Sequence, residues 1–450
     1  MNYKGKGVKL YFNSLIFGCF LRFLLLIMPI KKCRRILRKL VHSHDSAKAA
    51  LHYKKILRKT RKKTKFRVVF FIVHQAAWQY DPVYKIMEKD SRFKPIIVVV
   101  PYTIYGKKNM IKDMAACYEY FKGNNYNVTK SYNSDTDAYL DVKEKIKPDI
   151  IFFTNPHKLT EKQYSINYWA KHTLTCYSPY AYEASHLYQE HYNQKFHNIV
   201  WRYYQPHAIH KDLSTKYAVN KGENTAVVGY PRDDYLLDTK YKPKDLWKKQ
   251  DRVKKRIIWS PHQTLDENES VLGFSCFLFS HKIMLDLADK FHNEIQLLMK
   301  PHPLLKIKLY NHKNWGRKRT DEYFKVWKDK ENCQINEGGF IDLFLTSDAI
   351  ISSSISFIVE YLYVNKPAVF NLRNQNIPSK FNELGRLCYS HWYKATSYDD
   401  LESFISNVVI AGDDFKSDER NNFVKQNLLP PNWKTASENI MQNLLGDIVE

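Results

Sequence analysis

The chain has few of the patterns that signal disulfide or zinc chemistry. Its seven cysteines are scattered over 450 residues, are odd in number, and include no Cys-x-x-Cys pair. A disulfide framework and a zinc ribbon are therefore excluded, and a reducing compartment is the simplest interpretation. No His-Glu-x-x-His motif occurs, and the adjacent pairs Asp233–Asp234 and Asp413–Asp414 make poor chelators because neighbouring side chains diverge. We expect no bound structural metal and no protein cofactor, although a diphosphate ligand could carry Mg²⁺.

Acidic residues are nearly absent from the first 66 positions. This segment holds 19 Lys or Arg against the single acid Asp45, a local net of +18 within a total of +25. Val8–Ile30 is apolar and long enough to reach across a bilayer. Arg22 raises the cost of insertion, and no small-residue cleavage site of a signal peptide follows. Residues 1–65 therefore predict membrane association at the cytoplasmic face, lying in the interface or spanning once. The alternative is a buried helix with a solvated tail, and without a recognised binding motif a nucleic-acid role is not expected.

Beyond residue 65, short apolar runs alternate with helical patterns. Apolar runs end at Val73, Val100 and Phe153 in a first set, and at Ser260, Met299 and Ser352 in a second set. Such alternation is typical of doubly wound α/β domains with parallel sheets. We predict an N-terminal Rossmann-like domain over 66–240, a C-terminal one over 250–400, and bridging helices over 401–450. The charged stretch Asp238–Lys255 is the expected interdomain hinge.

Polar turns follow the three strands of the second set. Ser260 leads to Pro261–His262, Met299 to Lys300–Pro301–His302–Pro303, and Ile351 to a run of serines. Ligands of open α/β sheets bind at the carboxyl ends of the strands, so these turns outline one site. Imidazole and hydroxyl groups there suit a phosphate-bearing ligand, with backbone N–H groups before the next helix adding to the site.

Several phrases of this chain resemble the CDP-glycerol glycerophosphotransferases, which make teichoic acid and related capsule polymers. They are Val228–Gly229–Tyr230–Pro231, Lys300–Pro301–His302–Pro303, and the block from Asp342 to Pro367. Lys147–Pro156 and Tyr177–Tyr182 are similar to a capsule-cluster branch of that family. The chain departs from the family pattern at Ser353, where an Asp is usual, and at Ile355, where a small residue is usual. The WHG-type motif of the polymerases, which carries their proposed acceptor base, is not recognisable.

The resemblance implies a GT-B fold, with two Rossmann-like domains facing across a cleft. It also implies transfer of glycerol phosphate, or a related polyol phosphate, from CDP-glycerol to a lipid-linked or polymeric acceptor, with release of CMP. His302 is the expected catalytic hydrogen-bond donor, and the base on the acceptor side is expected at His74 or His172. His157 is a third candidate for the base. The donor-binding residues are expected to be His262, Thr264, Lys300, Ser353, Ser354, Ser356 and Glu360.

Two other functions remain open at this point. A GT-B glycosyltransferase with a nucleotide-sugar donor would use the same strand ends, and the departures from the family pattern leave room for it. A non-catalytic partner of a capsule synthesis complex would bind no nucleotide. The nucleotide by-product distinguishes glycerol phosphate transfer from sugar transfer. The first releases CMP, whereas sugar transfer usually releases a nucleoside diphosphate.

Overall fold

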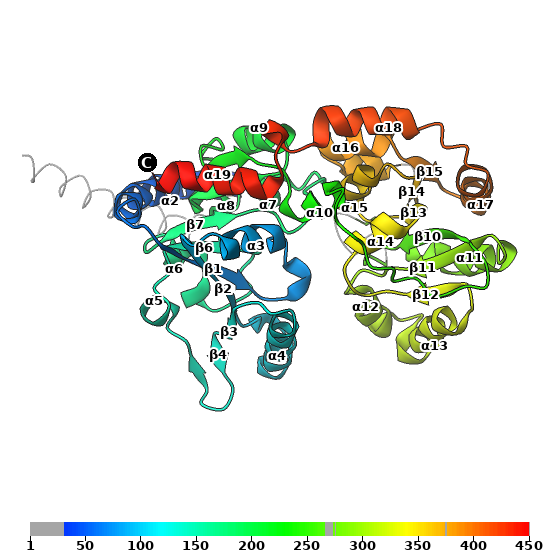
Figure 1. Cartoon of the computed structure of the whole chain (residues 1–450), viewed down its shortest axis with the longest axis horizontal. Helices are drawn as coiled ribbons and strands as arrows, with labels where there is room; N and C mark the ends of the chain where they lie inside the picture. Colours follow the sequence, from blue (N-terminus) through cyan, green and yellow to red (C-terminus); the bar gives the residue numbers. More distant parts are fainter. Residues whose placement is uncertain (1–30, 266–272, 275, 374–375, 450) are drawn as a thin grey trace, which may run out of the picture. The chain divides into compact units, whose positions relative to one another are not determined.

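The computed structural model describes residues 31–265, 273, 274, 276–373 and 376–449. They form two compact units, each with its own parallel sheet (Figure 1). Unit 1 draws on Met1–Tyr180, Tyr188–Pro231 and Pro430–Glu450, and unit 2 on Ala181–Leu187 and Arg232–Leu429. The chain therefore changes units four times, after Tyr180, Leu187, Pro231 and Leu429.

Unit 1 is built on a seven-stranded sheet with the strand order β3-β2-β1-β6-β7-β8-β9. All neighbours in this sheet pair in parallel, and six of the seven β1 residues are buried. This explains the continuous apolar sequence FRVVFFI, because a parallel strand covered on both faces needs no polar alternation. The strands are β1 (Phe66–Ile72), β2 (Phe93–Val99), β3 (Val128–Lys130), β6 (Ile150–Phe153), β7 (Leu174–Tyr177), β8 (Arg202–Gln205) and β9 (Thr225–Val227). A separate antiparallel pair consists of β4 (Tyr132–Asn133) and β5 (Ala138–Tyr139).

Helices of unit 1 begin at recognisable sequence signals. Asp81–Pro82 opens α3, where proline at the first turn costs no hydrogen bond, and Thr435 with Glu438 forms a capping box on α19. The helices are α2 (Lys31–Thr60), α3 (Asp81–Lys89), α4 (Lys107–Gly123), α5 (Val142–Lys145), α6 (Ile166–Trp169), α7 (Tyr188–Tyr192), α8 (Lys195–Ile199), α9 (Ala208–Tyr217) and α19 (Ala436–Ile448).

Unit 2 contains a six-stranded parallel sheet with the order β12-β11-β10-β13-β14-β15. Its core is aromatic: the Trp259 ring stacks on Phe277 and Trp327, with centroids 5.8 and 5.3 Å away. Such offset ring pairs add to the free energy gained from burying their area. The strands are β10 (Lys255–Ser260), β11 (Ile295–Met299), β12 (Cys333–Ile335), β13 (Ala349–Ser352), β14 (Ala368–Asn371) and β15 (Tyr393–Ala395).

Helices follow most strands of unit 2, as expected for a doubly wound unit. They are α10 (Asp234–Leu237), α11 (Phe277–Lys290), α12 (Leu305–Asn311), α13 (Gly316–Asp329), α14 (Ile341–Thr346), α15 (Phe357–Glu360), α16 (Glu383–Ser390), α17 (Tyr398–Ser403) and α18 (Ser417–Phe423). A 3-10 turn, η5 (Tyr361–Val364), extends α15, and π-helical segments η7 (Phe404–Ile410) and η8 (Val424–Leu428) extend α17 and α18.

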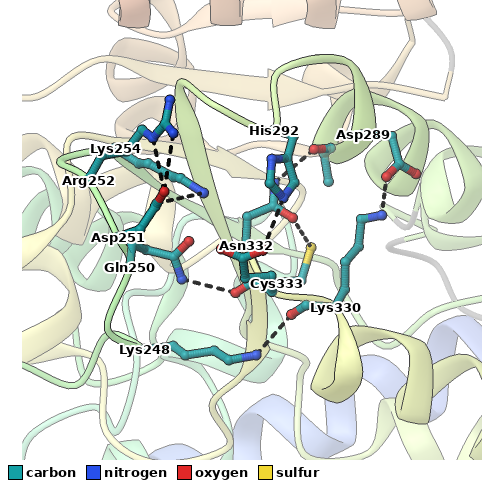
Figure 2. Close-up of polar contacts among 12 residues, drawn as sticks. Lys248, Gln250, Asp251, Arg252, Lys254, Asp289, His292, Lys330, Asn332 and Cys333 are labelled. Carbon is teal, nitrogen blue, oxygen red and sulfur yellow. Dashed lines mark hydrogen bonds and ion pairs between the residues drawn. The ribbon is translucent and has the colours of Figure 1, made fainter.

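The charged stretch Asp238–Lys255, expected to be the hinge, instead belongs to unit 2. Its Lys248 and Gln250 side chains donate to the backbone oxygens of Lys330 and Glu331, at 3.0 and 2.9 Å (Figure 2). Trp247 is buried and donates to Thr346 at 3.0 Å. The change of unit occurs earlier, between Pro231 and Arg232.

The tail predicted as bridging helices is divided between the units. Residues 401–429 remain with unit 2, whereas Pro430–Glu450 join unit 1 through α19. Gly229 makes this return close. It has φ +93°, and a β-carbon on it would lie 2.8 Å from Pro430 and 2.9 Å from Ala436, so the Gly-Tyr-Pro phrase has a backbone role.

The predicted membrane segment is only partly described, because Val8–Ile30 lies outside the described residues. Its second half forms α2 and packs on unit 1, where the buried Tyr53 hydroxyl contacts Thr175 at 2.6 Å and donates to Ile199 O at 2.9 Å. Within the part of the chain that the structure describes, no helix is both long and apolar enough to cross a bilayer.

Candidate functional site

The carboxyl ends of three neighbouring strands in unit 2 carry the residues predicted for the site. β10 lies between β11 and β13, with Trp259 beside Met299 and Ser260 beside Ser352. The turns after these strands therefore begin at the same level of one sheet edge. This is the edge at which open α/β sheets bind ligands.

His262 and His302 lie next to each other at this edge, with ring centroids 5.8 Å apart. The Nδ1 atom of His302 accepts the Leu304 N–H at 3.1 Å, and Nδ1 of His262 accepts the Thr264 N–H at 3.3 Å. In a neutral imidazole the other nitrogen then carries the proton, so both rings have an Nε2–H to donate. Burial, and then nearby Lys308, lower the pKa of His302 to about 4, so this ring donates as a neutral group at pH 7.

Thr264 and Ser353 orient His262 rather than add ligand contacts of their own. Thr264 is buried and its hydroxyl lies 3.0 Å from Nδ1 of His262, while Ser353, also buried, accepts the His262 N–H at 3.1 Å. Ser354 and Ser356 are half-buried, and their hydroxyls lie 3.5 Å apart. Ser356 makes no side-chain capping bond to α15. The hydroxyls of Ser354 and Ser356 are therefore the ones placed to meet a ligand.

Two ionisable side chains of this region, Lys300 and Glu360, are buried. Lys300 donates to Gly338 O, and burial followed by Arg232 lowers its pKa to about 8, against the opposing effect of Glu337 and Glu360. Burial raises the pKa of Glu360 to about 7, although Arg232 and Lys300 act in the opposite direction. An ammonium that burial destabilises gains most from an anionic ligand, which restores the partner that water no longer provides.

A buried cluster beside Glu360 was missed from the sequence. Tyr182 donates to Asp233 and lies 3.0 Å from the Tyr363 hydroxyl, which in turn donates to Leu428 O at 2.8 Å. Burial, and then Glu360, hold the pKa of Asp233 well above its usual range. The signal was an Asp-Asp pair beside a proline turn, which sequence reasoning considered only as a chelator.

The two histidines predicted as acceptor bases lie at opposite edges of the unit 1 sheet. His74 follows β1 at the carboxyl edge, where its Nδ1 accepts the Ala76 N–H at 3.0 Å. His172 precedes β7 at the amino-terminal edge and packs on Tyr168, with centroids 4.8 Å apart. The structure thus does not bring them together. Because His172 lies at the amino-terminal edge, it is a poor candidate for the base of a site at the carboxyl edge.

The geometry suits binding of a phosphate or diphosphate. It offers two Nε2–H donors, two accessible hydroxyls and one partly desolvated ammonium at a single sheet edge. Among the residues that the structure describes, no group of three or more His, Cys, Asp or Glu could hold a metal ion. We expected no Asp-x-Asp motif, and this was wrong, because Asp135–Thr136–Asp137 is one. Its Asp137 pairs with Lys107 at 2.9 Å and accepts from Tyr132 at 2.5 Å. The expectations about metal and Mg²⁺ stay predictions.

Solved structures of known proteins resemble the fold of this chain. The wall teichoic acid polymerase TagF, in a variant with one histidine replaced by asparagine, is 16% identical with a TM-score of 0.54, over 90% of this chain and 97% of that one. The same variant soaked with CDPG is 16% identical with a TM-score of 0.52, over 90% of this chain and 98% of that one. UDP-GlcNAc 2-epimerase from Neisseria meningitidis is 14% identical with a TM-score of 0.51, over 85% of this chain and 100% of that one. These likenesses show a GT-B-type fold of two α/β units, as predicted.

Sequence comparison is more specific than the fold. No curated protein matches the chain. The family profile described as CDP-Glycerol:Poly(glycerophosphate) glycerophosphotransferase matches residues 189–445, more than half of the chain and all of the strand-end turns of unit 2. The predicted family and transferase activity are thereby confirmed: the chain belongs to the CDP-glycerol:poly(glycerophosphate) glycerophosphotransferase family.

Proposed function

We propose that this transferase moves glycerol phosphate from CDP-glycerol to a hydroxyl of a lipid-linked or polymeric acceptor, and that the unit 2 edge binds the diphosphate of the donor. The observation that carries the proposal is the His262–His302 pair, with two Nε2–H groups side by side in the matched segment. Neutral donors and one ammonium at a strand edge fit the diphosphate of a nucleotide donor, and the family match favours CDP-glycerol as that donor.

The reaction is an attack by the acceptor oxygen on the phosphorus that bears glycerol. A new P–O bond forms, the P–O bond to CMP breaks, and the acceptor proton leaves to a base. Negative charge develops on the leaving and non-bridging oxygens. Catalysis therefore depends on donors held in place before the reaction, which stabilise that charge without reorganising.

Each residue of the edge then has a role. His302 Nε2–H donates to a diphosphate oxygen, its ring fixed by Leu304 N–H and by the prolines on either side. His262 donates beside it and is oriented by Thr264 and Ser353. In this proposal Lys300 supplies positive charge, Ser354 and Ser356 contribute hydroxyls, and Glu360 accepts hydrogen bonds from hydroxyl groups of the nucleoside.

The test is which nucleotide the purified chain releases. Incubation with CDP-glycerol and an acceptor should release CMP, and CDP-ribitol should be a poorer donor if glycerol is the natural alcohol. UDP- and GDP-sugars serve as the competing donors. Release of a nucleoside diphosphate from one of them, with no CMP from either CDP-alcohol, would replace the proposal with sugar transfer.

The same proposal places the enzyme at the cytoplasmic face of a membrane. Beyond the apolar sequence Val8–Ile30, α2 exposes Lys54, Lys55, Arg58 and Lys59 together with Leu51, which is 54% exposed. Cations and an apolar side chain on one surface helix fit an anionic bilayer.

A variant without residues 1–30 should move from the membrane to the soluble fraction and keep CMP release. The full chain should stay membrane-bound in high salt, because salt screens only the contribution of the exposed cations. The variant Lys54→Ser/Lys55→Ser is the matched control: it should remain bound but become more salt-sensitive. A truncated chain that still sediments with membranes in high salt would rule out the apolar segment as the anchor.

A further inference from the structure

A basic stretch follows the His302 turn of unit 2. Residues 304–320 contain six Lys or Arg and no Asp or Glu. They form α12, the turn after it and the start of α13, and the two helices lie against each other (Figure 1). Four of the cations lie in that turn and at the start of α13. We call them the basic corner: Lys313, Arg317, Lys318 and Arg319.

The charges of the basic corner are not neutralised within the part of the chain that the structure describes. All four side chains are exposed, and none of them forms an ion pair with a described carboxylate. The next acid along the chain, Asp321, lies 3.3 Å from Lys306 and accepts from Tyr310 at 2.6 Å. Arg317 acts on this carboxylate only from beyond ion-pair distance. The basic corner is therefore a concentrated positive charge that is open to a ligand.

Aromatic rings hold the two arginines of the basic corner in place. The Arg317 guanidinium lies over the Tyr310 ring, 4.6 Å from its centroid. Arg319 lies over Trp315 in the same way at 4.5 Å, and donates to Asn314 O at 2.8 Å. A guanidinium held on a ring keeps its planar fork of N–H groups ready for phosphate oxygens, and it loses less entropy on binding than a mobile lysine. The surface thus suits a series of phosphate groups.

We propose that the basic corner binds the phosphodiester chain of a poly(glycerophosphate) acceptor, behind the end that receives the new unit. The inference rests on the proposed function, in which the acceptor can be a polymer. Each glycerol phosphate unit of such a chain carries one negative charge at its phosphodiester, so the chain is a polyanion. Because α12 joins the His302 turn to the basic corner within one unit, a bound polymer stays near the donor edge at a raised local concentration.

An anionic bilayer is the competing partner, and the basic corner fits it less well. Helices that bind a membrane surface insert aromatic and large apolar side chains into the lipid. Trp315 is only 8% exposed, and Arg319 covers its ring. The exposed apolar residues nearest in sequence, Leu304 and Ile307, lie at the start of α12 and not in the basic corner. The observations therefore favour a chain of phosphodiesters.

The first measurement is the binding of fluorescent poly(glycerophosphate) chains to the full-length enzyme. Arg317→Gln/Lys318→Gln should raise the Kd roughly fivefold, the effect of losing two contacts between exposed charges. Higher salt should narrow the difference from the unaltered enzyme, since salt screens such contacts. Lys242→Gln/Lys244→Gln is the matched control: it removes the same charge from exposed lysines of unit 2 and should leave the Kd unchanged.

The second measurement is transfer from CDP-glycerol to acceptors of different length. With a long polymer, Arg317→Gln/Lys318→Gln should raise the acceptor KM by a similar factor. With an acceptor of one glycerol phosphate unit, the KM should hardly change. The donor KM and kcat should stay the same with both acceptors, because the basic corner contacts neither the donor nor the reacting atoms.

The outcomes separate the possible partners. An unchanged Kd for the polymer, or an equal rise in Lys242→Gln/Lys244→Gln, would overturn the proposal. Weaker binding of Arg317→Gln/Lys318→Gln to phosphatidylglycerol vesicles, with normal affinity for the polymer, would assign the surface to the bilayer instead. If the unaltered enzyme released no CMP from CDP-glycerol, the proposed function would fail, whereas the polymer Kd values would still decide this inference.

Discussion

His302→Ala should lower kcat on CDP-glycerol by on the order of a hundredfold or more, the usual effect of removing one preorganised donor from a developing charge. A hundredfold loss corresponds to about 2.7 kcal/mol of transition-state stabilisation. Because the ring is neutral at pH 7, this loss comes from a hydrogen bond rather than from a positive charge. Steady-state CMP release at saturating donor measures it.

The matched variants locate the effect. His302→Gln keeps an N–H donor and should lose less turnover than His302→Ala. Ser354→Ala and Ser356→Ala should mainly raise the donor KM, because the surviving hydroxyl of the pair and backbone N–H groups still contact the phosphate. A His302→Ala enzyme with normal kinetics on its true donor, and with an unchanged melting temperature, would remove His302 from the centre of the site.

Strand positions could be predicted from the sequence because the strands of a buried parallel sheet are continuous apolar runs. FRVVFFI, IQLLM and AIIS each form a strand that ends at the expected residue or one residue before it. β8, with the sequence RYYQ, was missed because aromatic residues interrupted by an arginine do not form such a run. β12 and β15 have three residues each and were missed for lack of length.

The change between units could not be read from composition. Charge density suggested Asp238–Lys255, but lysine and glutamine side chains can bond to the end of a sheet as well as to water. Gln296 donates to Lys248 O at 2.7 Å, and Gln334 to Leu246 O at 2.9 Å, so neutral residues of distant strands secure the charged stretch. These are long-range pairings without a periodic signal in the sequence.

The types of residue that follow the strands predicted which side chains lie together in the site. The sequence did not predict which histidine nitrogen carries the proton. The proximity of His262 and His302 follows from the neighbouring strands β10 and β11. Which nitrogen carries the proton depends on turns two residues long, at Ala76 and Leu304, that only coordinates reveal. The sequence therefore identified His74 and His172 as equal candidates, although one lies at the wrong edge and the other lacks a free lone pair.

Lys300→Met should raise the donor KM by roughly a hundredfold, because it removes the buried ammonium beneath the phosphate turns, where screening by water is weak. In the unaltered enzyme, kcat/KM for the donor should fall by about tenfold per pH unit above pH 8. The sign follows from the lowered pKa: the charged form of Lys300 is lost as pH rises through about 8 rather than 10.5. Lys300→Arg keeps its charge and should move this decline to higher pH.

The contribution of Lys300 to stability has the opposite pH dependence. Between pH 8 and 10.5 the unfolded lysine binds more protons than the folded one, so this group makes the fold more stable as pH rises. Burial also lowers the pKa of Lys366 to about 8, but its ammonium donates to Phe344 O at 3.0 Å and Leu345 O at 2.8 Å, at the end of α14. A pH profile that is the same in Lys300→Arg as in the unaltered enzyme would assign the decline to Lys366 or another group, and would remove Lys300 from donor binding.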